Sequence, residues 1–207
     1  MDKIIAILAR IISGISFPLF MPAYAILIAF TQTYLRLLPG NTLVTVLLVT
    51  LGVTIMLPVI AIYILHATGR ISDPLLNNRH DRTIPFAVTA LCYLGLSGYL
   101  WKIHAPGWMT AFMLGAAALV GIVLIINSFW KISGHAAGLG GLTALTVFLT
   151  YRGFSLGGLS LPAMIIILSG IVCTCRLLLN RHSLSQVAAG YFLSLVVIYT
   201  SLLVANI

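Results

Sequence analysis

Acidic residues are almost absent from this chain. Only three Asp or Glu residues stand against eleven Lys and Arg among 207 residues, so the formal net charge is +8. Charged residues amount to 7% of the chain and hydrophobic residues to 61%, whereas an average soluble domain is about a quarter charged. This balance excludes a soluble domain and predicts an integral membrane protein with anionic partners. Nucleic acid is a poor candidate, because the basic residues are scattered over short connections and form no single patch.

Cysteine is also scarce. Cys92, Cys173 and Cys175 all lie inside apolar runs, which is typical of small core residues and not of a disulfide or a metal site. No cluster of cysteines or carboxylates is present that would hold a metal ion. The sequence therefore predicts neither a metal nor another cofactor.

Long apolar runs, by contrast, occur seven times. A bilayer core about 30 Å thick needs about 20 apolar residues per helix. Pro18 and Pro22 are expected to kink the first run; as an alternative, the residues before Ser16 lie along the membrane surface, with Lys3 and Arg10 facing headgroups. We interpret this run as an uncleaved segment, because Arg10 interrupts it. The runs cover residues 4 or 15 to 29, 42–66, 83–102, 108–130, 135–150, 161–179 and 187–207.

These runs indicate one domain over residues 1–207. No repeat, low-complexity tract or soluble domain separates them. We therefore predict an all-α integral membrane protein, a helical bundle of six or seven transmembrane helices.

Three polar segments, 79–85, 131–135 and 175–186, interrupt the apolar sequence. Two apolar runs separate the first from the second, and two more separate the second from the third. Because each pair of crossings returns the chain to the same side, all three segments are expected at one membrane surface. Guanidinium groups without matching carboxylates suit a multiply charged oxyanion such as phosphate. The residues gathered there would be Arg79, Arg82, Lys131, Ser133, His135, Arg176, Arg181 and His182.

These segments also resemble the signatures of the type 2 phosphatidic acid phosphatase superfamily. Ser133-Gly134-His135 is similar to the second signature, P-S-G-H. Arg176, followed after five residues by His182, is similar to the third, S-R-x5-H-x3-D. Segment 79–85 is loosely similar to the first, K-x6-R-P. The match covers residues from about 79 to 190, and the whole chain resembles a bacterial branch of small membrane proteins in that superfamily.

The sequence departs from these signatures at several positions. The most consequential is Gln186, which occupies the place of the Asp in the third signature. The first signature has Arg and Pro next to each other, whereas in this chain two residues separate Arg82 from Pro85. The other replacements are Ile132 for Pro, Cys175 for Ser and Leu75 for Lys.

The resemblance implies a catalytic role for three residues. His182 would be the nucleophile that attacks phosphorus, and His135 the general acid that protonates the leaving oxygen. Gln186, one helical turn after His182, would accept the Nδ1 hydrogen and orient the ring, but it supplies no charge. The alternative is that His182 is an interfacial residue at the start of a helix.

The resemblance also implies a phosphate-binding set. Arg82 and Arg176 would hold the non-bridging oxygens, with Arg79 and Lys131 as helpers. The backbone N–H groups around Ser133 and Gly134 would face an anion at the start of a helix. Ser133 is equally typical of an ordinary N-cap. For Arg181 we favour an interaction with lipid headgroups.

These assignments predict a metal-independent phosphatase of the bacterial inner membrane. Its substrate would be a lipid phosphomonoester or diphosphate, such as phosphatidate, phosphatidylglycerophosphate, polyprenyl diphosphate or a lipid A phosphate. The intermediate would be a phosphohistidine, and the partners would be this anionic lipid and the surrounding membrane lipids. A non-catalytic lipid-phosphate binding or scaffold protein stands as the alternative, and a small transporter as a third hypothesis. The sequence leaves the exact lipid, the side of the membrane that the site faces and the oligomeric state open.

Overall fold

The protein is a bundle of helices, seen in a computed structural model that describes residues 3–74, 76 and 80–205. No strand occurs in that part of the chain. The α-helices are α1 (Lys3–Ile15), α2 (Met21–Gln32), α3 (Gly40–Leu51), α4 (Leu57–Ala67), α5 (Thr83–Lys102), α6 (Gly107–Asn127), α7 (Gly134–Tyr151), α8 (Ser160–Leu178) and α9 (Leu184–Val204). Shorter turns are η1 (Pro18–Phe20), η2 (Tyr34–Leu37), the π-helical η3 (Gly52–Met56) and η4 (His80–Arg82).

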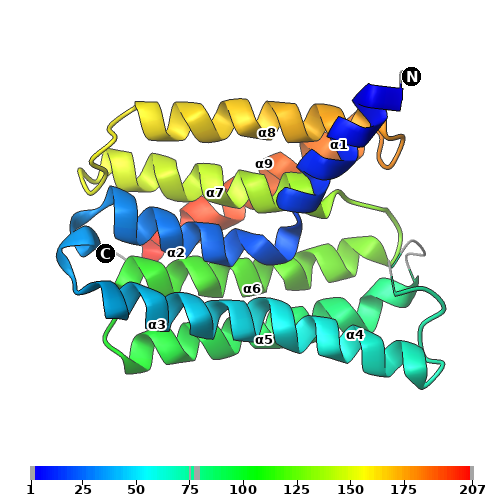
Figure 1. Ribbon diagram of the computed structural model, residues 1–207, viewed down its shortest axis with the longest axis horizontal. Helices are drawn as coiled ribbons and strands as arrows, with labels where there is room; N and C mark the ends of the chain where they lie inside the picture. Colours follow the sequence, from blue (N-terminus) through cyan, green and yellow to red (C-terminus); the bar gives the residue numbers. More distant parts are fainter. Residues whose placement is uncertain (1–2, 75, 77–79, 206–207) are drawn as a thin grey trace.

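Six helical stretches are long and apolar enough to cross a membrane. One of them, Gly40–Ala67, joins α3, η3 and α4 into a single helix. Helix α7 is not among the six, although it runs alongside the others through the bundle (Figure 1). The predicted fold class, an all-α membrane bundle, is confirmed. The other stretches are Lys3–Gln32, His80–Lys102, Gly107–Asn127, Ser160–Leu178 and Leu184–Val204.

The outer face of the bundle is strongly apolar. Leu91, Ile125, Ile167 and Phe192 each expose more than half of their side chains. Exposed apolar surface of this extent is unfavourable in water and suits contact with lipid chains. The protein is therefore a multi-pass membrane protein.

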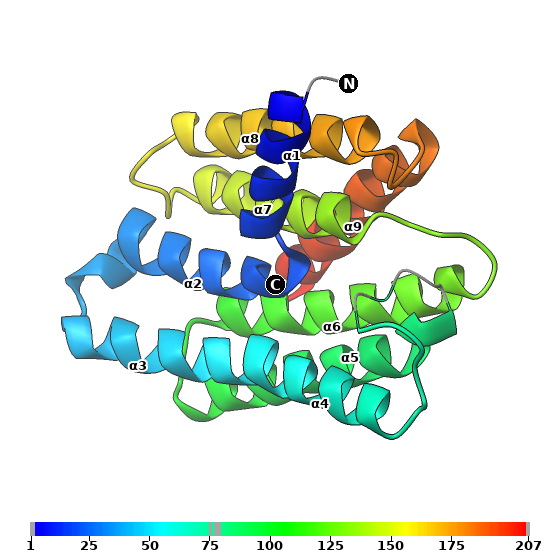
Figure 2. The same cartoon turned by 45° about the vertical axis from the view of Figure 1, so that its right-hand side comes forward.

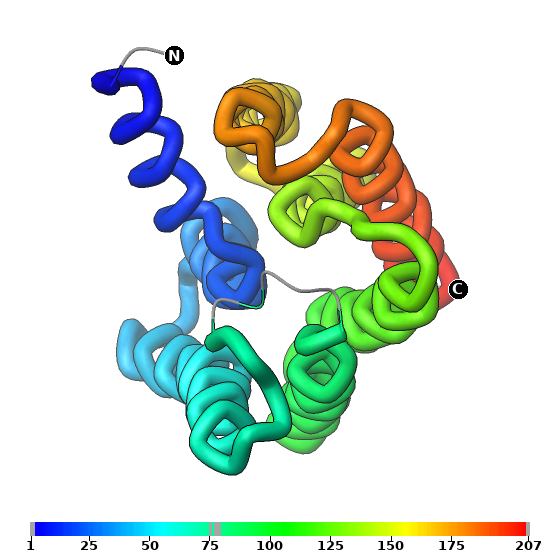
Figure 3. The backbone as a smooth tube through the Cα atoms, turned by 90° about the vertical axis from the view of Figure 1, so that its right-hand side faces the viewer, coloured from blue at the N-terminus to red at the C-terminus, as the bar shows by residue number. Residues whose placement is uncertain are grey.

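The first apolar run is kinked, as predicted from its prolines. Helix α1 ends at Ile15, and Pro18 begins the short turn η1 before α2 continues. Ser16 Oγ donates to the Ile12 carbonyl at 2.7 Å, which satisfies one carbonyl at the break. As a result α1 leans away from the direction of α2 and lies against α8 (Figures 1 and 3).

Helix α7 lies at the centre of the bundle and is mostly buried. Its contact with α9 is close because glycines face the neighbouring backbone. A Cβ at Gly140 would collide with the Tyr191 carbonyl oxygen, and a Cβ at Gly190 would come within 2.7 Å of the Ser133 carbonyl oxygen. Both glycines therefore set the distance between two helices that carry site residues.

Replacing Gly140 with alanine is expected to destabilise the bundle. The added methyl group meets backbone, which cannot rotate away, so α7 and α9 must separate, at a cost of about 1–3 kcal/mol. Thermal unfolding of the detergent-solubilised protein should show a lower midpoint. The matched control is Gly121→Ala on α6, where a Cβ has no neighbour within 4 Å. Equal midpoints for the two variants would contradict the proposed close approach.

The connections that carry the polar segments all lie at one end of the bundle. Figures 1 and 2 show the segments before α5, between α6 and α7, and between α8 and α9 at the same end, together with the amino-terminal end of α1. The described parts of the three polar segments thus share one end of the bundle, as the parity of the apolar runs predicts. The remaining question is whether the side chains at that end converge.

Candidate phosphate site

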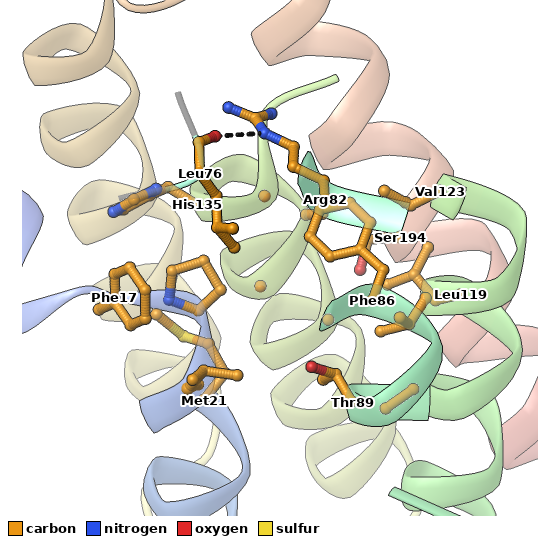
Figure 4. Close-up of a pocket in the computed structure, with 18 of the residues that line it drawn as sticks. Phe17, Met21, Leu76, Arg82, Phe86, Thr89, Leu119, Val123, His135 and Ser194 are labelled. Carbon is orange, nitrogen blue, oxygen red and sulfur yellow. Dashed lines mark hydrogen bonds between the residues drawn. The ribbon is translucent and has the colours of Figure 1, made fainter. Parts of the chain in front are cut away.

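A cavity of about 460 Å³ opens at this end of the bundle. Among the described residues, its mouth carries five cationic side chains and two imidazoles, and none of those that line the cavity is acidic. Below the mouth the walls are mostly apolar, with the hydroxyl groups of Thr89 and Ser194 among them (Figure 4). The mouth residues are Arg10, Arg82, Lys131, Arg176, Arg181, His135 and His182.

A short connection places Arg176 and His182 beside each other. Arg176 lies in the last turn of α8, where a cation suits the helix dipole. Asn180 then adopts a left-handed conformation with φ of 50°, and the Arg181 N–H donates to the Arg176 carbonyl at 3.2 Å. This tight turn places His182 over the C-terminal end of α8.

The cap of α9 fixes the orientation of Gln186. Ser183 and Gln186 form a capping box, in which the Ser183 backbone N–H donates to Gln186 Oε1 at 3.2 Å. Since an N–H group pairs only with an acceptor, the side-chain oxygen of Gln186, and not its NH₂ group, faces the start of α9.

That oxygen in turn fixes the tautomer of His182. His182 Nδ1 lies 3.1 Å from Gln186 Oε1, so Nδ1 must carry the hydrogen and donate it. Nε2 is then the nitrogen with the free lone pair. The contact predicted from the four-residue spacing is present, and it produces the tautomer that nucleophilic attack through Nε2 requires.

Backbone contacts join the start of α7 to the start of α9. The Ser133 N–H donates to the Gln186 carbonyl at 3.2 Å, and Ser133 Oγ accepts from the Ala136 N–H at 3.4 Å. Ser133 is fully buried and does not line the cavity. It therefore acts as an N-cap, and its N–H is already paired, while the neighbouring Gly134 does line the cavity.

His135 lies on the opposite wall, against the amino-terminal segment. Its Nε2 is 3.0 Å from the Ser13 carbonyl oxygen, and its ring meets that of Phe17 edge to face at 5.9 Å. A carbonyl only accepts, so Nε2 carries a hydrogen and Nδ1 is the nitrogen that exchanges a proton. Figure 4 shows His135 and Phe17 together, across the cavity from Arg82.

Several cations face one another at the mouth, and no acidic side chain is among the described residues that line the cavity. Arg82 Nε donates to the Leu76 carbonyl at 2.8 Å, which holds its guanidinium over the mouth (Figure 4). Arg176 Nε is buried and has no hydrogen-bond partner. Burial lowers the pKa of Lys131, and the charges of Arg82, Arg181 and Arg176 lower it further. Such a cluster favours a bound anion.

His182 is neutral over most of the pH range. Burial lowers its pKa from 6.5 to about 4, the Gln186 hydrogen bond opposes this, and the charges of Arg176, Lys131 and Arg82 lower it further. The unfolded chain binds this proton at higher pH than the folded chain does. Acidification from about pH 6.5 to about pH 4 therefore removes stability, while the nucleophilic form of the ring persists to about pH 4.

We expect NMR of the histidine rings to show this state directly. In ¹⁵N-histidine-labelled protein, the His182 ring, assigned by its absence in His182→Ala, should have a protonated Nδ1 and a bare Nε2 down to about pH 4. In Gln186→Ala the preference for the Nδ1–H tautomer should disappear. A His182 ring that titrates near 6.5, or one with a protonated Nε2, would contradict this description.

The cavity thus brings together most of the residues proposed from the sequence. Gln186 contacts His182 but does not itself line the cavity. Arg79 lies outside the described residues. Sequence reasoning missed Arg10 and Ser13, and it assigned Arg181 to headgroups, whereas all three line the cavity. The interruption of an apolar run by Arg10 was the available signal. The proposed residues that line the cavity are Arg82, Lys131, Gly134, His135, Arg176 and His182.

Comparisons of this chain with protein-family models, curated proteins and solved structures find no match. Among the described residues, no group of three or more His, Cys, Asp or Glu side chains could hold a metal ion. What the protein does must therefore be inferred from the chemistry of the cavity.

Proposed function

We propose that the protein is a lipid phosphohydrolase, related to the type 2 phosphatidic acid phosphatases and located in a bacterial inner membrane. It removes phosphate from a lipid phosphomonoester or diphosphate. The observation that carries the proposal is the pairing of His182 Nδ1 with Gln186 Oε1 at 3.1 Å, in the mouth of a cavity lined by cations. A neutral imidazole in a fixed tautomer is a nucleophile, and guanidinium forks suit the oxygens of a phosphate.

The first step transfers the phosphoryl group to the protein. The Nε2 lone pair of His182 attacks phosphorus, and the bond from phosphorus to the lipid oxygen breaks with its electron pair on that oxygen. Burial and the charge of Arg176 lower the pKa of His135 to about 4 in the empty cavity, whereas a bound phosphate dianion raises it. His135 therefore takes up a proton at Nδ1 together with the substrate and gives that proton to the leaving oxygen, while Nε2–H stays on the Ser13 carbonyl. Arg82, Lys131 and Arg176 balance the negative charge of the five-coordinate transition state.

The second step returns the protein to its starting state. Water attacks the phosphorus of the phosphohistidine and passes a proton to Nδ1 of His135. The phosphorus–nitrogen bond breaks, inorganic phosphate leaves, and His182 is again neutral.

A second candidate function is binding of a lipid phosphate without hydrolysis. It is favoured by one feature, the amide of Gln186, which orients His182 but offers no negative charge to the imidazolium-like transition state. A comparable Asp to Asn change in serine proteases costs about 10⁴ in rate, largely through the wrong tautomer. Here the tautomer is the productive one, so a smaller loss is expected, and hydrolysis remains our first proposal.

The test is phosphate release by the purified protein in lipid nanodiscs. We expect release from at least one of phosphatidate, lysophosphatidate, phosphatidylglycerophosphate and polyprenyl diphosphate. Rapid acid-free quenching with ³²P-labelled substrate should trap a phosphoprotein whose label maps to His182. Release without label at His182 would overturn the proposed intermediate.

The binding alternative makes a different prediction in the same assay. Lipid phosphate would bind, the wild-type protein would release no phosphate, and Gln186→Asp would begin to release it. No release by either protein from any of these lipids would overturn the phosphatase proposal.

A further inference from the structure

The His135 ring is held by the amino-terminal segment of the chain. Its Nε2 donates to the Ser13 carbonyl at 3.0 Å, and the ring of Phe17 contacts it edge to face. Both contacts come from the end of α1, outside the three polar segments that resemble phosphatase signatures. A carbonyl within a helix normally accepts from the N–H four residues later. The Ser13 carbonyl is therefore available to His135 only because α1 ends at this point.

The last four carbonyls of α1, from Ile12 to Ile15, all have partners. Carbonyls at a helix end lack the next turn and must find other donors. His135 is the donor to the Ser13 carbonyl, 122 positions along the chain. The other donors are the Ser16 N–H at 3.0 Å and the Ser16 hydroxyl at 2.7 Å for Ile12, the Phe17 N–H at 3.3 Å for Gly14, and the Tyr24 hydroxyl at 2.7 Å for Ile15.

Pro18 decides which carbonyl is left for the imidazole. In a continuing helix, residue 18 would donate to Gly14 and Phe17 would donate to Ser13. Proline has no N–H, and it also disfavours the helical conformation of the residue before it. Phe17 is accordingly extended, with φ of −61° and ψ of 135°, and its N–H pairs with the Gly14 carbonyl. The Ser13 carbonyl is thereby left without its helical donor.

This carbonyl has two effects on His135. It keeps the hydrogen on Nε2, so that Nδ1 is the nitrogen that accepts and releases a proton. It also stabilises the imidazolium form, because an N–H of a cation makes a stronger hydrogen bond than a neutral one. The hydrogen bond raises the pKa of His135 and so opposes the lowering by burial.

Packing holds the end of α1 in place beside this ring. The two buried residues of α1 are Ala9 and Ser13, which are one turn apart, and α1 packs against α8. On the other side, a Cβ at Gly134 would lie 3.4 Å from Cγ of Pro18. Pro18 therefore ends α1 and also contacts the residue that directly precedes His135.

We propose that Ser13 and Pro18 are positioning residues for the general acid: Pro18 leaves the Ser13 carbonyl unpaired, and this carbonyl orients His135 and stabilises its protonated form. The amino-terminal helix is then a working part of the active site. This inference rests on the proposed function, because it takes His135 to be the acid that protonates the leaving oxygen.

The ring proton of His135 tests the contact without any turnover. In ¹⁵N-histidine-labelled protein in nanodiscs at pH 7, the ring assigned by its absence in His135→Ala should show an Nε2–H that exchanges slowly with water. Pro18→Ala supplies the missing N–H and lets Phe17 donate to Ser13, so this signal should be lost to exchange. Pro18→Gly also supplies an N–H but favours helix less, so its effect should be smaller. Thermal unfolding identifies a variant that is misfolded.

The pH profile of kcat tests the stabilisation of the protonated acid. The rate falls as pH rises through the pKa of a general acid in the substrate complex, so a lower pKa moves this alkaline limb to lower pH. In Pro18→Ala the limb should move down by about one pH unit or more, and kcat at pH 7 should fall about tenfold to hundredfold, with little change in KM. The other groups near His135 are unchanged in this variant; they are Arg176 of α8, His182 before α9, and Arg10 of α1, which lines the same cavity.

Two further variants serve as controls for the NMR signal. Ser13→Ala removes the hydroxyl, which has no hydrogen-bond partner, but keeps the carbonyl, so the Nε2–H signal should persist. Pro22→Ala removes a proline in the first turn of α2, where no helical hydrogen bond is gained at the Ser13 carbonyl. Both the signal and the alkaline limb should stay in place in Pro22→Ala.

The outcomes separate this inference from the proposed function. A wild-type His135 ring with its hydrogen on Nδ1 would overturn the positioning role without bearing on phosphate release. The same conclusion would follow if the Nε2–H signal and the alkaline limb were unchanged in a folded Pro18→Ala protein. A signal that is present in the wild type and lost in Pro18→Ala, with no phosphate released from any lipid, would support the contact and contradict the phosphatase.

Discussion

His182→Ala is expected to lower the rate of phosphate release by about 10⁴ or more. The residue supplies the attacking lone pair, and the loss of a nucleophile in hydrolases that use one costs up to about 10⁶. Arg82, Lys131 and Arg176 would still hold the substrate, so the dissociation constant should change little. Single-turnover assays with excess protein separate the two quantities, because they report binding and chemistry independently.

A matched histidine control is available at the other end of the bundle. His104 lies between α5 and α6 with a left-handed φ of 55°, a conformation that Asn tolerates, so His104→Asn should retain full activity. Imidazole added to His182→Ala should restore part of the release, since the alanine leaves room for it beside the cations. Equal rates for the wild-type protein and His182→Ala would eliminate His182 as the nucleophile.

Much of this fold follows from the sequence, because a membrane helix is determined largely by its own composition. The predicted run 83–102 coincides with α5. The run predicted to end at 130 belongs to α6, which ends at Asn127, because Ser128 Oγ donates back to the Ile125 carbonyl at 2.6 Å and turns the chain. The predicted run 135–150 also corresponds to α7 (Gly134–Tyr151), although the glycines of this helix lower its apolar character while they allow the close contact with α9.

The candidate site was also predictable only in part, because local contacts follow from residue spacing and long-range contacts do not. The contact between His182 and Gln186 is local, one turn of helix, and the spacing predicted it. The contact between His135 and Ser13 joins residues 122 positions apart, and no periodicity reports on such a pairing. For the same reason the sequence assigned Arg181 to lipid headgroups and did not assign Arg10 to the site. The cavity as a whole has no sequence signature, because its walls come from separate helices.

Arg176 is the residue whose replacement should lower activity without lowering stability. Arg176→Gln should lower kcat/KM by about 10²–10³, the usual cost of removing one donor to a developing negative charge. Arg176→Lys should recover only part of this, because an ammonium group lacks the two-pronged geometry of the guanidinium. Arg36→Gln, at the opposite end in η2, is the matched control and should have no effect.

The same substitution should not reduce the free energy of unfolding. Arg176 keeps a buried Nε without a partner, and Arg181 and Arg82 are close enough to repel its charge. The Arg176 side chain is half-buried, and a charge that is partly removed from water and repelled by neighbouring cations opposes folding, so Arg176→Gln should unfold at the same temperature as the wild-type protein or at a higher one. A structural cation at a helix end would behave oppositely, with activity lost only in proportion to stability. Measuring kcat/KM and thermal unfolding on one preparation therefore distinguishes a residue kept to bind an anion from one kept to hold the bundle together.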